Sequence, residues 1–179
     1  MTCQTQVVRT APLRKRALLA FCAFLAAAGA QAAQTGTVTG LPIPRFVSLK
    51  SDRVNLHEGP AKDHRTVWIY QRAGLPVEIT AEFDTWRKIR DSEGTEGWVL
   101  HSLLSGRRTA LVSPPQKGAD TLLRAKPLAE ANPVAKLQAG VIGSVKACKD
   151  GWCRLLGENF DGWIEQQKIW GAYPGEAIE

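Results

Sequence analysis

The sequence predicts an all-β protein made of two tandem small barrels that follow an N-terminal signal peptide. Short segments of alternating apolar and polar residues succeed one another closely, separated by turns rich in glycine and aspartate. A tryptophan pattern also occurs twice. Gly97-Trp98-Val99 returns as Gly162-Trp163-Ile164, and each copy follows a second tryptophan, Trp86 or Trp152. The 179 residues are therefore expected to fold as two similar units.

Residues 1–32 have the composition of a secretory signal peptide. Basic residues between positions 9 and 16 precede an apolar run from Ala17 to Ala28, which is shorter than the roughly 20 residues of a membrane-spanning helix. Ala30-Gln31-Ala32 then supplies the small-x-small pattern of a cleavage site. We expect cleavage after Ala32 or Ala33, export to the periplasm or the extracellular space, and no membrane span in the mature chain.

Removing residues 1–32 also changes the charge of the protein. The segment contains four basic residues and no acidic ones, so Lys+Arg falls from 23 to 19 against 17 Asp+Glu, and the net charge falls from +6 to +2. The mature chain contains no basic run interleaved with aromatic residues. We therefore expect no nucleic-acid partner.

Two cysteines, Cys148 and Cys153, remain after the predicted cleavage. They flank Asp150-Gly151, a strong turn signal between two strand-like segments. In an exported protein this pattern predicts a disulfide across the hairpin. The alternative, a redox-active pair, requires a Cys-x-x-Cys motif at the start of a helix, and neither condition is met here.

The unit boundaries follow from the strand pattern and from the breaks between strands. Residues 33–46 are small, polar and proline-bearing, and we expect a flexible N-terminus. The remaining predicted segments are a first barrel at 47–112, a linker at 113–118, a second barrel at 119–174 and a C-terminal tail at 175–179. Strands are expected in the first barrel near 46–49, 53–57, 67–70, 75–81, 86–90, 97–100 and 109–112, with one helical or 3₁₀ turn at 102–106.

Several motifs of the first predicted barrel resemble those of a known family. Val54-Asn55-Leu56-His57-Glu58-Gly59-Pro60, the Trp86-x-x-Ile89 strand and Gly97-Trp98-Val99 are similar to the bacterial SH3-like (SH3b) family, and the chain from about Phe46 onward resembles its exported two-copy members. The resemblance implies small, strongly bent barrels that act as binding or targeting modules for cell-wall peptides or envelope proteins.

The chain departs from the family pattern in the loop that follows the first motif. Residue 57 is His where the family usually has Arg, and residue 58 is Glu where a small or apolar residue is common. The second copy keeps the basic residue as Arg124 but lacks the glycine. We therefore expect the two copies to bind differently.

The alternation of side chains along each predicted strand indicates the candidate binding residues. If Ile89 and Val99 point into the first core, the two-residue period places Trp86 and Trp98 on the opposite face. The same argument applies to Trp152 and Trp163 in the second unit. The predicted ligand-binding residues are these four tryptophans together with His57 and Arg124. In the alternative hypothesis the protein is a scaffold, and the tryptophans are buried between the barrels.

No set of residues points to catalysis. His57, His64 and His101 are the only histidines; they lack the spacing of a zinc site and have no plausible nucleophile nearby. The acidic residues gather in hairpin turns, where turn chemistry accounts for them. We expect no catalytic residue, no metal and no cofactor, and the sequence leaves the oligomeric state open.

Overall fold

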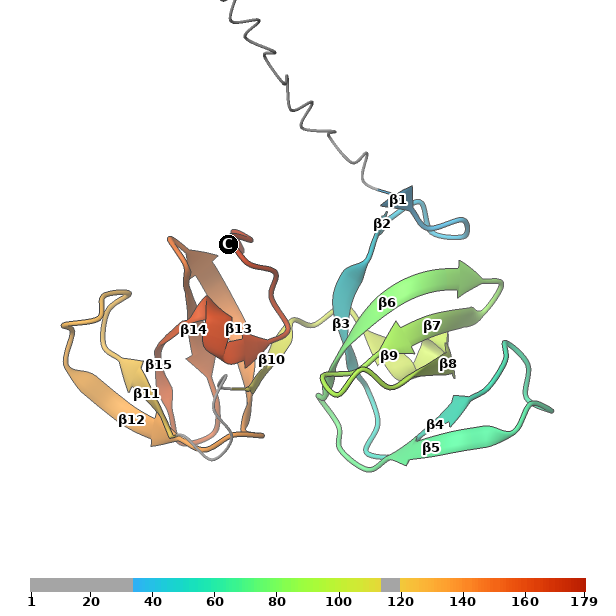
Figure 1. Cartoon of the computed structure of the whole chain (residues 1–179), viewed down its shortest axis with the longest axis horizontal. Helices are drawn as coiled ribbons and strands as arrows, with labels where there is room; N and C mark the ends of the chain where they lie inside the picture. Colours follow the sequence, from blue (N-terminus) through green and yellow to red (C-terminus); the bar gives the residue numbers. More distant parts are fainter. Residues whose placement is uncertain (1–33, 114–119) are drawn as a thin grey trace, which may run out of the picture. The chain divides into compact units, whose positions relative to one another are not determined.

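The computed structural model of this chain describes residues 34–113 and 120–179 (Figure 1). The predicted signal peptide, its cleavage sites and the predicted linker beyond Ser113 lie outside the described residues. The described part is almost entirely β-structure, as predicted, and it forms two seven-stranded antiparallel sheets and one two-stranded sheet.

The first seven-stranded sheet has the order β5-β4-β8-β7-β6-β3-β9. Figure 1 shows its β4–β5 hairpin set apart from the other strands of the sheet. A 3₁₀ turn, η1, spans His101–Leu103 and connects β8 to β9. The strands are β3 (Arg45–Leu49), β4 (Val54–His57), β5 (Thr66–Tyr70), β6 (Pro76–Phe83), β7 (Trp86–Arg90), β8 (Glu96–Leu100) and β9 (Leu104–Ser105).

The second sheet repeats this arrangement strand for strand, in the order β12-β11-β15-β14-β13-β10-β16. Its 3₁₀ turn, η2, spans Gln166–Lys168 and corresponds to η1. The two tandem barrels predicted from the repeat are therefore confirmed. The strands are β10 (Thr109–Val112), β11 (Thr121–Arg124), β12 (Pro133–Leu137), β13 (Ile142–Lys149), β14 (Trp152–Leu156), β15 (Asp161–Glu165) and β16 (Ile169–Trp170).

In the structure, the second unit begins earlier in the chain than the sequence pattern predicts. Thr109–Val112, predicted as the last strand of the first unit, pairs with β13 and β16 and is the first strand of the second sheet. In the first sheet the corresponding strand is β3, which pairs with β6 and β9. The pattern of Thr109–Val112 identifies a strand correctly, but a strand pattern does not specify which distant strand will pair with it.

The N-terminal segment, which we predicted to be flexible, forms a hairpin in the structure. Strand β1 (Gln34–Thr35) pairs with β2 (Pro42–Ile43) in a small hairpin, and Ile43 packs into the first core. The hairpin is held by the buried Glu82 carboxylate, which accepts hydrogen bonds from the backbone N–H groups of Val38 (3.0 Å) and Thr39 (2.9 Å). At the other end of the chain, Ile178 of the predicted tail pairs through its backbone with Cys148.

Each barrel encloses its own core. The apolar residues that alternate along the strands are buried, including Ile89 and Val99 in the first barrel and Leu155 and Ile164 in the second, each 0% exposed. The two-residue alternation that was used to assign the tryptophans is therefore confirmed for the residues that face the core.

The repeated Gly-Trp pattern reflects a close approach between strands. Gly97 lies within β8, and a Cβ at this position would lie 2.5 Å from Leu56 Cγ and 2.9 Å from the His57 carbonyl oxygen. Gly162 has the same relation to β11, with the Arg124 carbonyl oxygen 3.0 Å from such a Cβ. The glycine is required because β4 crosses β8 closely, whereas the turn before β8 has its own glycine, Gly94, at φ 86°.

We expect Gly97→Ala to lower the free energy of unfolding by about 1–3 kcal/mol, because the added methyl group overpacks the contact between β4 and β8. Chemical denaturation would measure the change. Gly106→Ala is the matched control, since a Cβ at Gly106 meets no atom within 4 Å. Equal stability of the two variants would contradict this account of the motif.

Candidate functional site: an aromatic groove on the first barrel

The first barrel carries a pocket beside its β4–β5 hairpin. The pocket has a volume of about 430 Å³, and we call it the Trp86 pocket. A second hollow, of about 560 Å³, shares Lys62 and Leu100 with it and extends along η1 to Ser102. The two hollows are therefore adjacent, and we refer to them together as the groove of the first domain. The Trp86 pocket is lined by Arg53, Asn55, His57, Lys62, Trp86, Leu100 and Leu103.

Two of the predicted binding residues meet in this pocket. The rings of His57 and Trp86 lie edge to face, with centroids 5.3 Å apart. The Nδ1–H of His57 donates to the His64 carbonyl oxygen at 2.9 Å, because a carbonyl can only accept. This hydrogen bond orients the imidazole, and its Nε2 has no partner among the described residues.

The sheet register explains why these residues gather. His57 ends β4 and lies opposite Trp98 on β8, and Trp98 lies opposite Lys88 on β7. Trp86, at the start of β7, is a buried residue with 6% exposure, but it is not part of the apolar cluster around Ile89 and Val99. Trp98 is half-buried. Both tryptophans thus lie outside the cluster around Ile89 and Val99, and Trp86 is one of the residues that line the pocket.

The candidates of the second barrel occupy the same strand positions but have different surroundings. Arg124 lies opposite Trp163, as His57 does opposite Trp98, but its guanidinium donates to the Ala131 carbonyl oxygen at 3.0 Å. The Lys149 ammonium lies 5.5 Å from the centre of the Trp163 ring. Trp152 lines a pocket of about 500 Å³, here called the Trp152 pocket, which is bordered by Pro174 and Gly175 of the C-terminal segment.

Five lining residues of the Trp86 pocket were not among the predicted binding residues: Arg53, Asn55, Lys62, Leu100 and Leu103. Apart from Asn55, which lies within β4, each could have been suspected from its place in a loop or at a strand end beside a candidate tryptophan. No sequence pattern, however, brings the loop of Lys62 to the start of β7. That proximity depends on β8 pairing with both β4 and β7.

The acidic residue Asp91 of the first barrel has a structural role. Asp91 accepts hydrogen bonds from the N–H groups of Glu93 and Thr95, both at 2.9 Å, and from the Tyr70 hydroxyl at 3.0 Å. Burial of the Tyr70 ring, together with the charge of Asp91, raises the pKa of this phenol above its ordinary value. The turn chemistry predicted for Asp91 is thus present in the structure.

Within residues 34–113 and 120–179, no three His, Cys, Asp or Glu side chains lie close enough together to hold a metal ion. His57 and His64 are joined by the hydrogen bond described above. His101 lines the second hollow of the groove. In the same part of the chain, no helix is long and apolar enough to cross a membrane.

Sequence comparison matches the model of the bacterial SH3 domain to residues 50–106 and again to residues 117–171. The chain belongs to the bacterial SH3 domain family. It contains two copies of the domain, as predicted from the repeat, and domains of this family are typically binding modules. No protein with a curated description matches the chain.

Among solved structures, the chain is similar to three NlpC proteins. Trichomonas vaginalis NlpC2 is 12% identical over 71% of this chain and 48% of its own, with a TM-score of 0.32. Trichomonas vaginalis NlpC1 is 13% identical over 70% and 45%, with a TM-score of 0.32. A Bacillus cereus NlpC/P60 family protein is 12% identical over 73% and 57%, with a TM-score of 0.31. This chain therefore spans about half the length of each protein.

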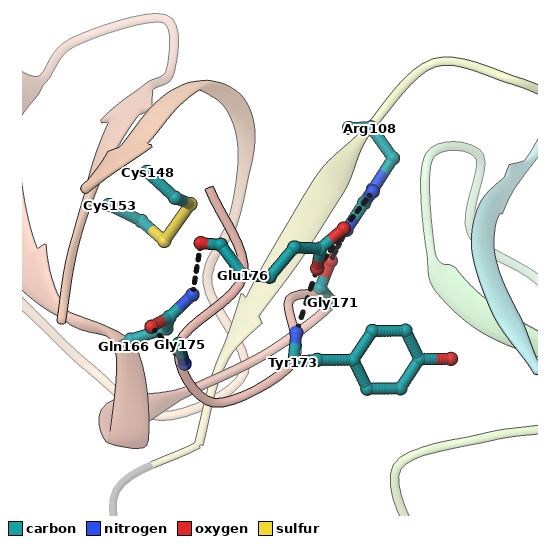
Figure 2. The surroundings of a disulfide bond; sticks show 8 residues. All are labelled: Arg108, Cys148, Cys153, Gln166, Gly171, Tyr173, Gly175 and Glu176. Atoms are coloured by element: carbon teal, nitrogen blue, oxygen red, sulfur yellow. Dashed lines mark hydrogen bonds and ion pairs between the residues drawn. A yellow bond between two sulfur atoms is a disulfide. The ribbon is translucent and has the colours of Figure 1, made fainter. Parts of the chain in front are cut away.

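Both bacterial SH3 domains belong to one compact unit, Ala33–Glu179, and the aromatic contacts between them involve other residues than the four candidate tryptophans. Among the described residues, Phe46 of the first domain lies edge to face with Trp170 at 5.1 Å and packs on Tyr173 at 4.7 Å. Figure 2 shows the segment that carries Tyr173, with Glu176 accepting hydrogen bonds from Arg108.

Proposed function

We propose that this protein is an exported, non-enzymatic binding module of the bacterial envelope, and that the groove of its first domain holds an extended peptide. The observation that carries the proposal is the open groove in which Trp86 and His57 meet beside Leu100. Aromatic-lined grooves bind extended peptides because a flat ring buries a large apolar area at a small cost in side-chain entropy. The wall peptide of peptidoglycan is the proposed ligand, and a segment of an envelope protein is the alternative.

Three further observations support this proposal. The chain belongs to a family whose domains are typically binding modules. It begins with a segment that has signal-peptide composition. The Cys148–Cys153 disulfide fits an oxidising compartment such as the periplasm or the extracellular space.

Retention on purified peptidoglycan sacculi tests the proposal. We expect the wild type to co-sediment with sacculi and Trp86→Ala to be retained at least about tenfold less, since a central aromatic residue carries much of the binding energy of such a site. Trp68→Ala is the matched control, because Trp68 is 55% exposed on β5 and lies outside both hollows of the groove. Thermal unfolding of all three proteins would separate lost binding from lost folding.

Three outcomes are informative. Wild-type protein that remains in the supernatant would exclude the wall as ligand and leave the envelope-protein alternative. Retention of Trp86→Ala at the wild-type level, with both proteins folded, would overturn the role of the groove. Loss of retention in Trp68→Ala alone would show that the binding surface lies on the β4–β5 hairpin instead of in the groove.

A further inference from the structure

The residues that line the tryptophan pockets of the two domains differ in charge. The Trp86 pocket contains Arg53, Lys62 and His57, and no carboxylate is among the described residues that line it. The Trp152 pocket contains Glu165, and no lysine or arginine is among its described lining residues. Trp86 and Trp152 both begin the same strand of the repeat, so the two pockets share this position. The Trp152 pocket also contains Gln166 and Gln167, the counterparts of His101 and Ser102 in the second hollow of the groove.

The strand register identifies the substitutions that cause this difference. Arg53 directly precedes β4, and Asp120 directly precedes the equivalent strand β11. Lys62 corresponds to Ala129 in the turn that follows, and Leu100 at the end of β8 corresponds to Glu165 at the end of β15. At these three positions the second domain is more negative or less positive than the first, whereas at the position of His57 it carries Arg124.

The basic groups also differ in their availability. Arg53 and Lys62 are exposed and form no ion pair with a described residue. In the second domain Arg124 is engaged by the Ala131 carbonyl, and the acid that replaces Arg53, Asp120, lies 2.6 Å from Lys136. The first pocket therefore offers two uncommitted cations beside an aromatic wall, whereas the second offers none.

From this charge pattern we infer that the Trp86 pocket recognises a peptide through a carboxylate, held by Arg53 and Lys62, and that the Trp152 pocket of the same chain does not. The aromatic and aliphatic wall formed by Trp86, Leu100 and Leu103 accommodates the small apolar part of such a peptide. This inference rests on the proposed peptide-binding function and adds the chemical class of the recognised group. A wall peptide and the C-terminus of an envelope protein both supply that group.

The probe is acetyl-trialanine with a free C-terminal carboxylate, compared with the same peptide as its carboxamide. Binding to the full chain is followed by the indole ¹⁵N–H signals of Trp86 and Trp152, assigned with Trp86→Phe and Trp152→Phe. We expect the acid to shift the Trp86 signal and to bind about five- to tenfold more tightly than the amide, the range expected of two solvent-exposed charge interactions. The Trp152 signal should remain in place.

Exchanging the two basic residues of the Trp86 pocket for their counterparts in the second domain completes the test. Arg53→Asp combined with Lys62→Ala should abolish the preference for the acid, while Lys146→Ala, which removes an exposed lysine of β13 outside the pockets, should retain it. Equal affinity for acid and amide, absence of any shift at Trp86, or an equal shift at Trp152 would overturn the inference.

The two proposals fail separately. Trp86-dependent retention on sacculi together with equal binding of acid and amide would leave wall binding intact and refute carboxylate recognition. A preference for the acid without retention on sacculi would establish the chemistry of the pocket and place its ligand among envelope proteins.

Discussion

Replacing Glu82 with alanine is expected to lower the free energy of unfolding by about 3–5 kcal/mol, because it leaves a buried guanidinium without its carboxylate partner. Glu82 Oε1 lies 3.5 Å from Arg87 Nε and 2.7 Å from Arg45 Nη2. The side chains of Glu82 and Arg87 are 0% and 3% exposed. The same change removes the hydrogen-bond acceptor of the β1–β2 hairpin, so this hairpin should separate from the first domain.

Chemical denaturation of Glu82→Ala would measure the loss, and Glu96→Ala provides the control. Glu96 pairs with Lys88 at 2.6 Å, but both side chains are more than a third exposed. Breaking such a surface pair is expected to cost less than about 1 kcal/mol. If Glu82→Ala were no less stable than Glu96→Ala, the buried ion pair would not be a major source of stability.

The Glu82 interaction also has a predicted pH dependence. Burial alone would raise the pKa of this carboxyl, but hydrogen bonds from Thr39 and Arg45 outweigh it and lower the pKa from 4.5 to about 2. A lowered pKa in the folded state means that the contribution to stability is complete above pH 4.5 and is lost as the pH falls towards 2. The stability curves of the wild type and Glu82→Gln should therefore converge in this interval.

Removing the disulfide with Cys148→Ala and Cys153→Ala is expected to cost about 2 kcal/mol, the chain-entropy value for so short a loop. The two sulfurs lie 2.02 Å apart across the β13–β14 hairpin, five residues apart in sequence, and both residues are almost fully buried. Because Cys148 also pairs with Ile178, the C-terminal segment should become more accessible to protease in the variant.

Thermal unfolding with and without reductant would test this prediction. Reductant should lower the melting temperature of the wild type to that of the double variant and leave the variant unchanged. Mass spectrometry of native protein should find Cys148 and Cys153 unalkylated until reductant is added. Alkylation of either residue in the native, unreduced protein would contradict the structural role of the bond.

The two domains use different chemistry at one position. Glu82 faces Arg87 across the β6–β7 hairpin, and Cys148 faces Cys153 across the β13–β14 hairpin at the equivalent place. A buried ion pair in one copy is thus replaced by a covalent bond in the other. The N-terminal hairpin is anchored by Glu82 and the C-terminal segment pairs with Cys148, so each terminal segment docks at the same part of its own domain.

Local patterns in the sequence were sufficient for several features. The two-residue alternation of Leu75, Val77 and Ile79 predicts a strand because successive side chains of a strand point to opposite faces. The same rule placed Ile89 and Val99 in the core and Trp86 on the other face. The Asp150-Gly151 turn between two strands predicted the disulfide, and the repeated Gly-Trp pattern predicted two copies of one domain.

Only the tertiary structure decided the features that depend on pairing between distant segments. Thr109–Val112 joins the second sheet because its partners are β13 and β16, and the β1–β2 hairpin is ordered by a carboxylate more than 40 residues away. Arg53 and Lys62 reach Trp86 because β8 lies between β4 and β7. Sequence alternation determines which face of a strand is buried, but it carries no information about which strand will be its neighbour, and the groove is formed by such neighbours.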